Sequence, residues 1–144
     1  MREGKIVIVH VDDSRTAREM VREALTEAGY EVHSAEDAQD LEQRLLANDE
    51  FRASVDLFVL DMEMPDLMGA QVGAIIDAVY EDLTHIPFII YSGKQKEWVE
   101  KNSAEVASMS PGFQKNYKGY VSKDAGAEKK LLELIGEIVG SRKQ

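Results

Sequence analysis

Carboxylate, hydroxyl and ammonium side chains stand directly after four separate apolar segments of this 144-residue chain. The residues in these positions are Asp12, Asp13, Asp61, Ser92 and Lys123. If each apolar segment is a strand of one parallel sheet, all five reach the same edge, since ligands bind beyond the carboxyl ends of such strands. The residue types and their positions therefore predict one polar site assembled from distant parts of the chain.

The predicted site contains the groups that magnesium-dependent phosphoryl chemistry requires. Three crowded carboxylates repel each other unless a cation lies between them, and Mg²⁺ prefers hard oxygen ligands, water and phosphate. An aspartate carboxylate can attack phosphorus and carry the phosphoryl group as an aspartyl phosphate. A lysine ammonium can pair with the phosphoryl oxygens, and a serine hydroxyl can donate a hydrogen bond to one of them.

Each of these residues also has a simpler interpretation. The Asp12–Asp13 pair could cap a helix, Asp61 and Ser92 could be turn residues, and Lys123 could be a solvated surface charge. Each simpler role is reasonable alone. The occurrence of all of them at four of the five predicted strand ends favours the functional interpretation.

The elements that would position the site alternate regularly along the chain. Short apolar segments predict strands over 5–11, 30–34, 55–60, 86–91 and 117–122. Residues 17–28, 72–83 and 131–139 have clear helical periodicity, residues 38–46 and 95–108 a weaker one, and Ser110-Pro111-Gly112 indicates a break. Connections of this length favour parallel pairing and right-handed crossovers. The pattern predicts a doubly wound α/β fold with helices on both faces of a five-stranded parallel sheet.

The composition excludes several classes of protein. With 17 basic and 27 acidic residues the net charge is −10, which argues against binding to nucleic acid or to an anionic membrane. The chain contains no cysteine, so disulfides and thiolate metal sites are excluded. Its apolar segments are far shorter than the ~20 residues that a membrane span needs. We therefore expect a single domain over residues 1–144 that is located in the cytoplasm.

Four motifs carry a resemblance to a known family: Val11-Asp12-Asp13-Ser14 with Arg18 after it, Asp61 to Gly69 (DMEMPDLMG), Ile89 to Gly93 (IIYSG) and Gly119 to Lys123 (GYVSK). Together they resemble the receiver domain of two-component response regulators, and most of all the small stand-alone kind typified by the chemotaxis regulator. The resemblance covers nearly all of residues 5–140. It implies a flavodoxin-like (βα)5 fold and a single receiver domain without an output domain.

The resemblance also implies roles for the residues around a bound Mg²⁺ ion. It makes Asp61 the phosphoacceptor and Asp13 a direct Mg²⁺ ligand. Asp12 would help, partly through water, and the backbone carbonyl of Glu63 would be a further ligand. The phosphoryl donor would be a histidine kinase or a phosphotransfer protein, and the signal would pass to a downstream protein target.

The same resemblance assigns three residues to the phosphoryl group and the switch. Ser92 would follow the phosphoryl group, and Lys123 would form a salt bridge with it. Tyr120 matches the switch aromatic of the family, which moves inward when the hydroxyl moves.

Three features depart from the usual pattern of the family. Lys123 is followed by Asp124 instead of proline, and the stretch between Ser92 and Lys123 is longer than usual, with the extra residues in 94–116. Glu63 and Lys94 occupy positions that tune the lifetime of the phosphoryl group in the family. Here they could form a pair across the mouth of the site.

Two other functions compete with this hypothesis. A haloacid-dehalogenase-like phosphatase would also use Asp61 as a nucleophile, but it needs a second aspartate where the chain has Glu63, and it places its paired acids late in the sequence. A receiver-like scaffold that is never phosphorylated would not need the complete acidic set. His10, His33 and His85 lack ligand spacing, and we expect them to be partly buried strand residues without a functional role.

Overall fold

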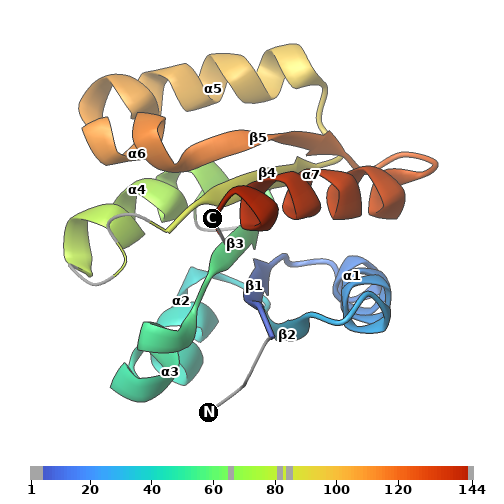
Figure 1. Ribbon diagram of the computed structural model, residues 1–144. Helices are drawn as coiled ribbons and strands as arrows, with labels where there is room; N and C mark the ends of the chain where they lie inside the picture. Colours follow the sequence, from blue (N-terminus) through green and yellow to red (C-terminus); the bar gives the residue numbers. More distant parts are fainter. Residues whose placement is uncertain (1–4, 65–66, 81–82, 84–85, 143–144) are drawn as a thin grey trace.

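The computed structural model describes residues 5–64, 67–80, 83 and 86–142. Its strands form one parallel sheet in the order β2-β1-β3-β4-β5, as Figure 1 shows. The strands are β1 (Val7–Val11), β2 (Glu31–Ala35), β3 (Leu57–Leu60), β4 (Phe88–Ser92) and β5 (Tyr117–Ser122). The fold class predicted from the sequence is confirmed.

Helical segments connect the strands and cover both faces of the sheet. They are α1 (Arg15–Glu27), α2 (Ala38–Asp40), the π-helix η1 (Leu41–Leu46), α3 (Asp49–Ser54), α4 (Gly69–Val79), α5 (Lys96–Met109), α6 (Pro111–Asn116) and α7 (Ala127–Arg142). Within the described residues no helix is long and apolar enough to cross a membrane.

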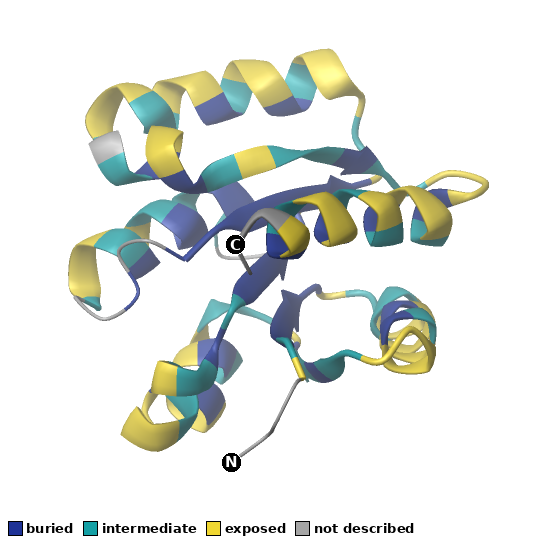
Figure 2. Cartoon of the chain, in the orientation of Figure 1, coloured by how far each residue is buried: buried dark blue, intermediate teal, exposed yellow. Residues whose placement is uncertain are grey.

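The central strands are buried along their whole length. Every residue of β1, β3 and β4 is buried, and Figure 2 shows these strands in the buried class while the outer helix surfaces are exposed. Both faces of a parallel sheet are covered by helices, so its inner strands are nearly continuous apolar runs. This explains why these three segments are recognisable in the sequence.

One face of the sheet, which we call the α1/α7 face, is covered by two uninterrupted helices. Ser14 caps α1, since its hydroxyl accepts a hydrogen bond from the Ala17 N–H at 3.2 Å. The helices and the strands share one apolar cluster on this face, which includes Leu25, Val59, Ile89, Leu131 and Ile135.

The opposite face, which we call the α2–α6 face, is covered by more helical segments, of which α2, η1, α3 and α6 are short. The weak periodicity of residues 38–46 becomes a single turn, α2, followed by the π-helix η1. The predicted break at residues 110–112 does end α5, but it also starts α6, which the sequence analysis did not include. The Ser110 hydroxyl accepts the Phe113 N–H at 3.3 Å, and proline suits the first turn of a helix.

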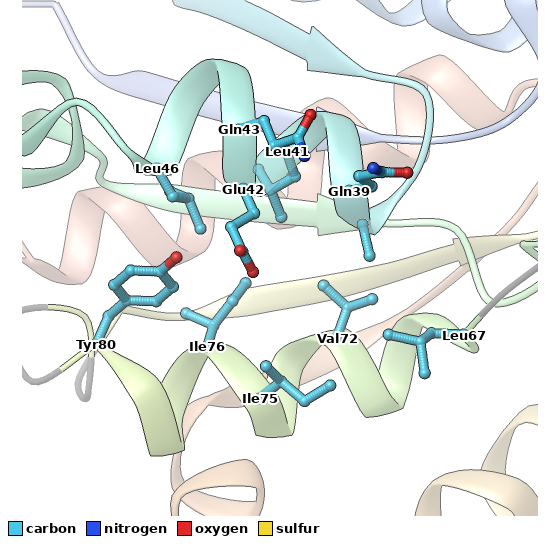
Figure 3. A pocket seen from close by; sticks show the side chains of 11 residues that line it. Gln39, Leu41, Glu42, Gln43, Leu46, Leu67, Val72, Ile75, Ile76 and Tyr80 are labelled. Carbon is cyan, nitrogen blue, oxygen red and sulfur yellow. The ribbon is translucent and has the colours of Figure 1, made fainter.

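Apolar grooves flank α4 on this face. A groove of about 350 Å³ separates α4 from α2 and η1, with Ile75, Ile76 and Tyr80 opposite Leu46 (Figure 3). A second groove of about 500 Å³ lies between α4 and the end of α5. Ile75 contributes to both. A further groove of about 570 Å³ runs along α1 beside Val32 of the α1/α7 face, so both faces carry open grooves.

Candidate functional site

Asp12, Asp13 and Asp61 converge at the carboxyl edge of the sheet. One carboxylate oxygen from each lies within 4.8 Å of the others. The backbone continues the sheet pattern at this edge, since the Asp12 N–H donates to Ala35 at 3.0 Å and the Asp61 N–H donates to Val11 at 2.8 Å. Asp12 and Asp61 are buried and Asp13 is exposed. The chain thus fixes two carboxylates at the floor of the site and leaves one at the surface.

Lys123 links the two buried carboxylates. Its Nζ lies 2.8 Å from Oδ2 of Asp12 and 3.2 Å from Oδ1 of Asp61. The backbone N–H of Lys123 donates to the Ser92 carbonyl oxygen at 2.9 Å, which anchors the end of β5 to β4. Burial lowers the pKa of Lys123, but the hydrogen bond and charge of Asp12 and the charge of Asp61 outweigh burial and raise it. Lys123 is therefore a fixed cation between the two carboxylates.

The two buried carboxylates differ in how readily they lose a proton. Burial and the charge of Asp12 raise the pKa of Asp61 to about 7, and Lys123 only partly offsets them. Burial also opposes ionisation of Asp12, but hydrogen bonds and charge from His10 and Lys123 bring its pKa below the ordinary value. Asp12 is thus ionised while Asp61 holds its proton up to neutral pH. A cation bound between them would relieve this repulsion.

Glu63 and Lys94 form the pair that the sequence suggested. Lys94 Nζ lies 3.3 Å from Oε2 of Glu63, and both side chains are partly exposed, at 41% and 56%. The backbone N–H of Glu63 also donates a hydrogen bond to the Asp61 carboxylate, which favours its ionised form. The pair thus joins the loop after β3 to the loop after β4, although an exposed pair of this kind contributes little to stability.

Ser92 and Tyr120 both contact the backbone of Lys94. The buried Ser92 hydroxyl accepts the Lys94 N–H at 3.1 Å, and the Tyr120 hydroxyl donates to the Lys94 carbonyl oxygen. Tyr120 is half-buried against the core of the α2–α6 face. Lys94 Nζ lies 5.2 Å from the centre of the Trp98 ring. The loop after β4 therefore connects the buried hydroxyl, the tyrosine and the start of α5.

Gly69 fits the close approach expected of a glycine after the Asp61 loop. A Cβ atom there would lie 2.4 Å from the carbonyl oxygen of Asp61, so only glycine allows α4 to begin this close to the acidic residue. Pro65 and Asp66 of the same motif lie outside the described residues. The peptide bond between Lys123 and Asp124 is trans, since the described residues contain no cis bond.

The sequence did not predict the contact that one histidine makes. We expected His10 to be partly buried and without function, but it is fully buried and its Nε2 lies 3.2 Å from Oδ2 of Asp12. The available signal was its position two residues before Asp12, which places both side chains on the same face of a strand. His33 is a half-buried strand residue as expected, 2.8 Å from Glu31. His85 lies outside the described residues.

A doubly wound sheet with an acidic cluster and a lysine at its carboxyl edge is the architecture of a phosphorylation-controlled signalling domain. Over residues 8–135 the sequence matches the family model of the response regulator receiver domain, and the chain belongs to this family. Receiver domains are phosphorylation-dependent switches of two-component signalling, as the sequence motifs predicted. The family match also removes the main support for the phosphatase hypothesis.

Solved structures of receiver proteins share the fold. The chemotaxis protein CheY4 of Vibrio cholerae has a TM-score of 0.73 at 19% identity, over 93% of this chain and 98% of that one. A CheY-like receiver domain protein of Methanospirillum hungatei also has a TM-score of 0.73 at 19% identity, over 97% and 98%. The regulator TrrA of Thermotoga maritima, solved in complex with Mg²⁺ and beryllofluoride, has a TM-score of 0.64 at 23% identity, over 90% and 98%.

A similar sequence also occurs within a much larger sensor protein. Over 86 residues, or 60% of this chain, the sequence is 29% identical to part of the CAI-1 autoinducer sensor kinase/phosphatase CqsS of Vibrio cholerae. The aligned stretch covers 12% of the length of that relative. Receiver-like sequences of this kind thus occur both in short proteins and inside long ones.

Proposed function

We propose that Asp61 accepts a phosphoryl group from a histidine kinase or a phosphotransfer protein, with Mg²⁺ bound, and that a partner-binding surface changes as a result. The observation that carries the proposal is the placement of Lys123 between Asp12 and Asp61, beside the third carboxylate of Asp13. This arrangement has one nucleophile, one fixed cation and two further carboxylates, all at the carboxyl edge of the sheet.

The proposed metal site fits the residues present. Its donors would be the carboxylates of Asp12, Asp13 and Asp61 with the backbone carbonyl of Glu63, and hard oxygen donors of this kind suit Mg²⁺. Bound there, Mg²⁺ would neutralise the negative charge of the carboxylates and of the incoming phosphoryl group. Burial and the charge of Asp12 both raise the pKa of Asp61, and a bound cation would offset both effects.

The transfer itself is a displacement at phosphorus. A carboxylate oxygen of Asp61 forms a bond to phosphorus while the bond from phosphorus to the histidine nitrogen of the donor breaks, and that nitrogen keeps the electron pair. Lys123 would pair with a phosphoryl oxygen, and the Ser92 hydroxyl would turn from the Lys94 N–H to donate to another. Attack by water on the aspartyl phosphate then releases inorganic phosphate and returns the Asp61 carboxylate.

The output surface is proposed to include Tyr120 and the segment 94–116. Only Val99 and Ser103 are buried in the whole length of α5, so this helix is held by few core contacts and can shift at low cost. Lys94 connects the segment to Ser92 through its N–H and to Tyr120 through its carbonyl oxygen. A downstream protein would bind here. We further propose that residues 1–144 form a single receiver domain that acts in the cytoplasm and catalyses only its own phosphorylation and dephosphorylation.

Incubation with acetyl phosphate and Mg²⁺, followed by intact mass spectrometry, tests the proposal. The wild type should gain the mass of one base-labile phosphoryl group, and Asp61→Asn should gain none because the amide is not a nucleophile. Asp49→Asn is the matched control, since Asp49 is an exposed aspartate on α3, and it should be labelled like the wild type. A wild type that stays unlabelled would favour the scaffold hypothesis, and labelling of Asp61→Asn would refute the assignment of the nucleophile.

A further inference from the structure

His10 is a polar side chain inside an apolar layer. It lies on β1 opposite Ser34 of β2 and Val59 of β3, with no exposed surface. Its ring packs edge-on against Tyr91, with 6.1 Å between the ring centres. Burying a polar group costs free energy unless it is hydrogen-bonded, so the contacts of its two nitrogens decide what the residue does there.

Only one nitrogen of the His10 ring has a partner in the described part of the chain. Nε2 lies 3.2 Å from Oδ2 of Asp12, and Nδ1 has no hydrogen-bond partner among those residues. Because the Asp12 carboxylate can only accept, Nε2 carries the proton and donates. The ring thus leaves one nitrogen unpaired, and its one hydrogen bond goes to Asp12.

Asp12 is held from several directions. Its Oδ1 accepts the Ser14 N–H at 3.0 Å, and Arg18 donates to its backbone oxygen at 2.7 Å. Its Oδ2 accepts from both Lys123, at 2.8 Å, and His10. Lys123 also reaches Asp61, the residue that is to carry the phosphoryl group. If Lys123 turns toward that group, Oδ2 of Asp12 keeps a donor only because His10 is there.

We propose that His10 is a positioning residue for Asp12, which holds Oδ2 from inside the sheet and so fixes the carboxylate for Mg²⁺ while Lys123 is free to pair with the phosphoryl group. This inference rests on the proposed function, since it takes Asp12 to be part of the metal site. Hydrogen-bond partners of metal-binding carboxylates orient them, and their removal commonly weakens metal affinity 10- to 100-fold.

The test is the Mg²⁺ dissociation constant of the unphosphorylated protein, measured by titration calorimetry. His10→Leu fills a similar volume without a donor and should weaken Mg²⁺ binding by about 10-fold. His10→Gln should recover most of the affinity, because its amide nitrogen reaches about as far as Nε2. The shorter His10→Asn should not. His33→Leu removes another strand histidine that bonds to a carboxylate, Glu31, and should leave Mg²⁺ binding unchanged.

A second measurement separates positioning from simple support of the fold. In chelator, His10→Leu should unfold in urea at the same or a higher concentration than the wild type, because it removes the unpaired Nδ1. Equal Mg²⁺ affinity of the wild type and His10→Leu would overturn the inference. If His10→Leu does not fold, equal affinity of His10→Gln and His10→Asn overturns it. A wild type that binds no Mg²⁺ would instead contradict the proposed function itself.

Discussion

The two faces of the sheet differ in how firmly they are built. The α1/α7 face has two continuous helices over one apolar cluster. The α2–α6 face has a π-helix and several short helices (Figure 1). Grooves lie on both sides of α4, and Figure 3 shows the one toward α2 and η1. Short helices are only marginally stable by themselves, so the second face can rearrange at a lower cost than the first.

The residues of the site divide between the two faces in the same way. Asp12 lies two residues after His10, and Asp61 lies two residues after Val59, so both continue the row of side chains on the α1/α7 face. Lys123 Nζ lies 5.6 Å from the centre of the Tyr91 ring on the same face. Ser92 follows Ile90 of the α2–α6 face at an alternate position, and Tyr120 packs on that core. The acid–lysine set, which is Asp12, Asp61 and Lys123, thus lies on the α1/α7 face. Ser92 and Tyr120 lie on the α2–α6 face.

The largest expected effect is a loss of stability when the buried side chain of Phe113 is removed from the α2–α6 face. Phe113 is 2% exposed and packs on Phe88 and Tyr117, with ring centres 5.1 Å and 5.5 Å away. Phe113→Ala should lower the free energy of unfolding in urea by about 3–5 kcal/mol, yet the folded variant should still be phosphorylated. Met109→Ala, at an 84% exposed site, should change stability by less than about 0.5 kcal/mol. Loss of phosphorylation in folded Phe113→Ala would break the comparison.

On the α1/α7 face, the raised pKa of Asp61 makes the free energy of unfolding depend on pH. In chelator the folded state keeps the Asp61 proton up to about pH 7, whereas the unfolded state releases it near its ordinary pKa of about 4. The folded state therefore binds more protons in this window, and the Asp61 contribution to stability is lost as pH rises from about 4 to 7.

The comparison of the wild type with Asp61→Asn measures this contribution together with its coupling to Asp12 and Lys123, because groups away from the site titrate alike in both proteins. The stability of the wild type relative to Asp61→Asn should fall by roughly 3 kcal/mol between pH 4 and pH 7, at up to about 1.4 kcal/mol per pH unit. Urea unfolding at a series of pH values measures it. A constant difference over this range would show that Asp61 is not held in its protonated form.

Mg²⁺ should stabilise the folded protein through the same three carboxylates. At a hundredfold excess over the dissociation constant, the gain is about 2.7 kcal/mol, which a thermal melt with and without chelator can detect. Asp13→Asn should remove most of this gain. In chelator, however, it should be slightly more stable than the wild type, because it removes a negative charge close to the carboxylate of Asp12. An Asp13→Asn variant that is less stable in chelator would identify Asp13 as a structural cap.

The smallest expected effect is a change in tryptophan fluorescence on the α2–α6 face. Trp98 is half-buried next to Lys94, and its emission should change when beryllofluoride, a stand-in for the phosphoryl group, is added with Mg²⁺. The change should vanish in Asp61→Asn and shrink in Ser92→Ala, which lacks the hydroxyl that contacts the Lys94 N–H. Unaltered emission, together with unaltered hydrogen exchange over residues 94–116, would place the output surface elsewhere.

The strands and the polar edge could be predicted because their signals are local. Tyr117–Ser122 is a strand with the predicted bounds, and the segment 55–60 contains β3. Polar residues directly after such strands must meet at one edge of a parallel sheet. The grouping of Asp12, Asp13, Asp61 and Lys123 therefore followed from the order of the strands alone.

The features that escaped prediction depend on contacts between distant residues. The helix α6 carries Phe113, whose ring packs on Phe88 and Tyr117, and no local pattern in residues 110–116 reveals these contacts. The spacing of Leu41, Leu45 and Leu46 fits an α-helix as well as the π-helix observed. The bond between His10 and Asp12 requires both the strand register and a ring nitrogen aimed at the carboxylate.

The position of Lys123 also has a consequence for synthesis of the protein. It joins Asp61 across 62 residues of sequence, and it is the last residue of the acid–lysine set to leave the ribosome. At about 5–20 residues per second, a nascent chain exposes its aspartates for several seconds before the ammonium that accompanies them exists. The growing chain therefore lacks the lysine of this set until β5 is made.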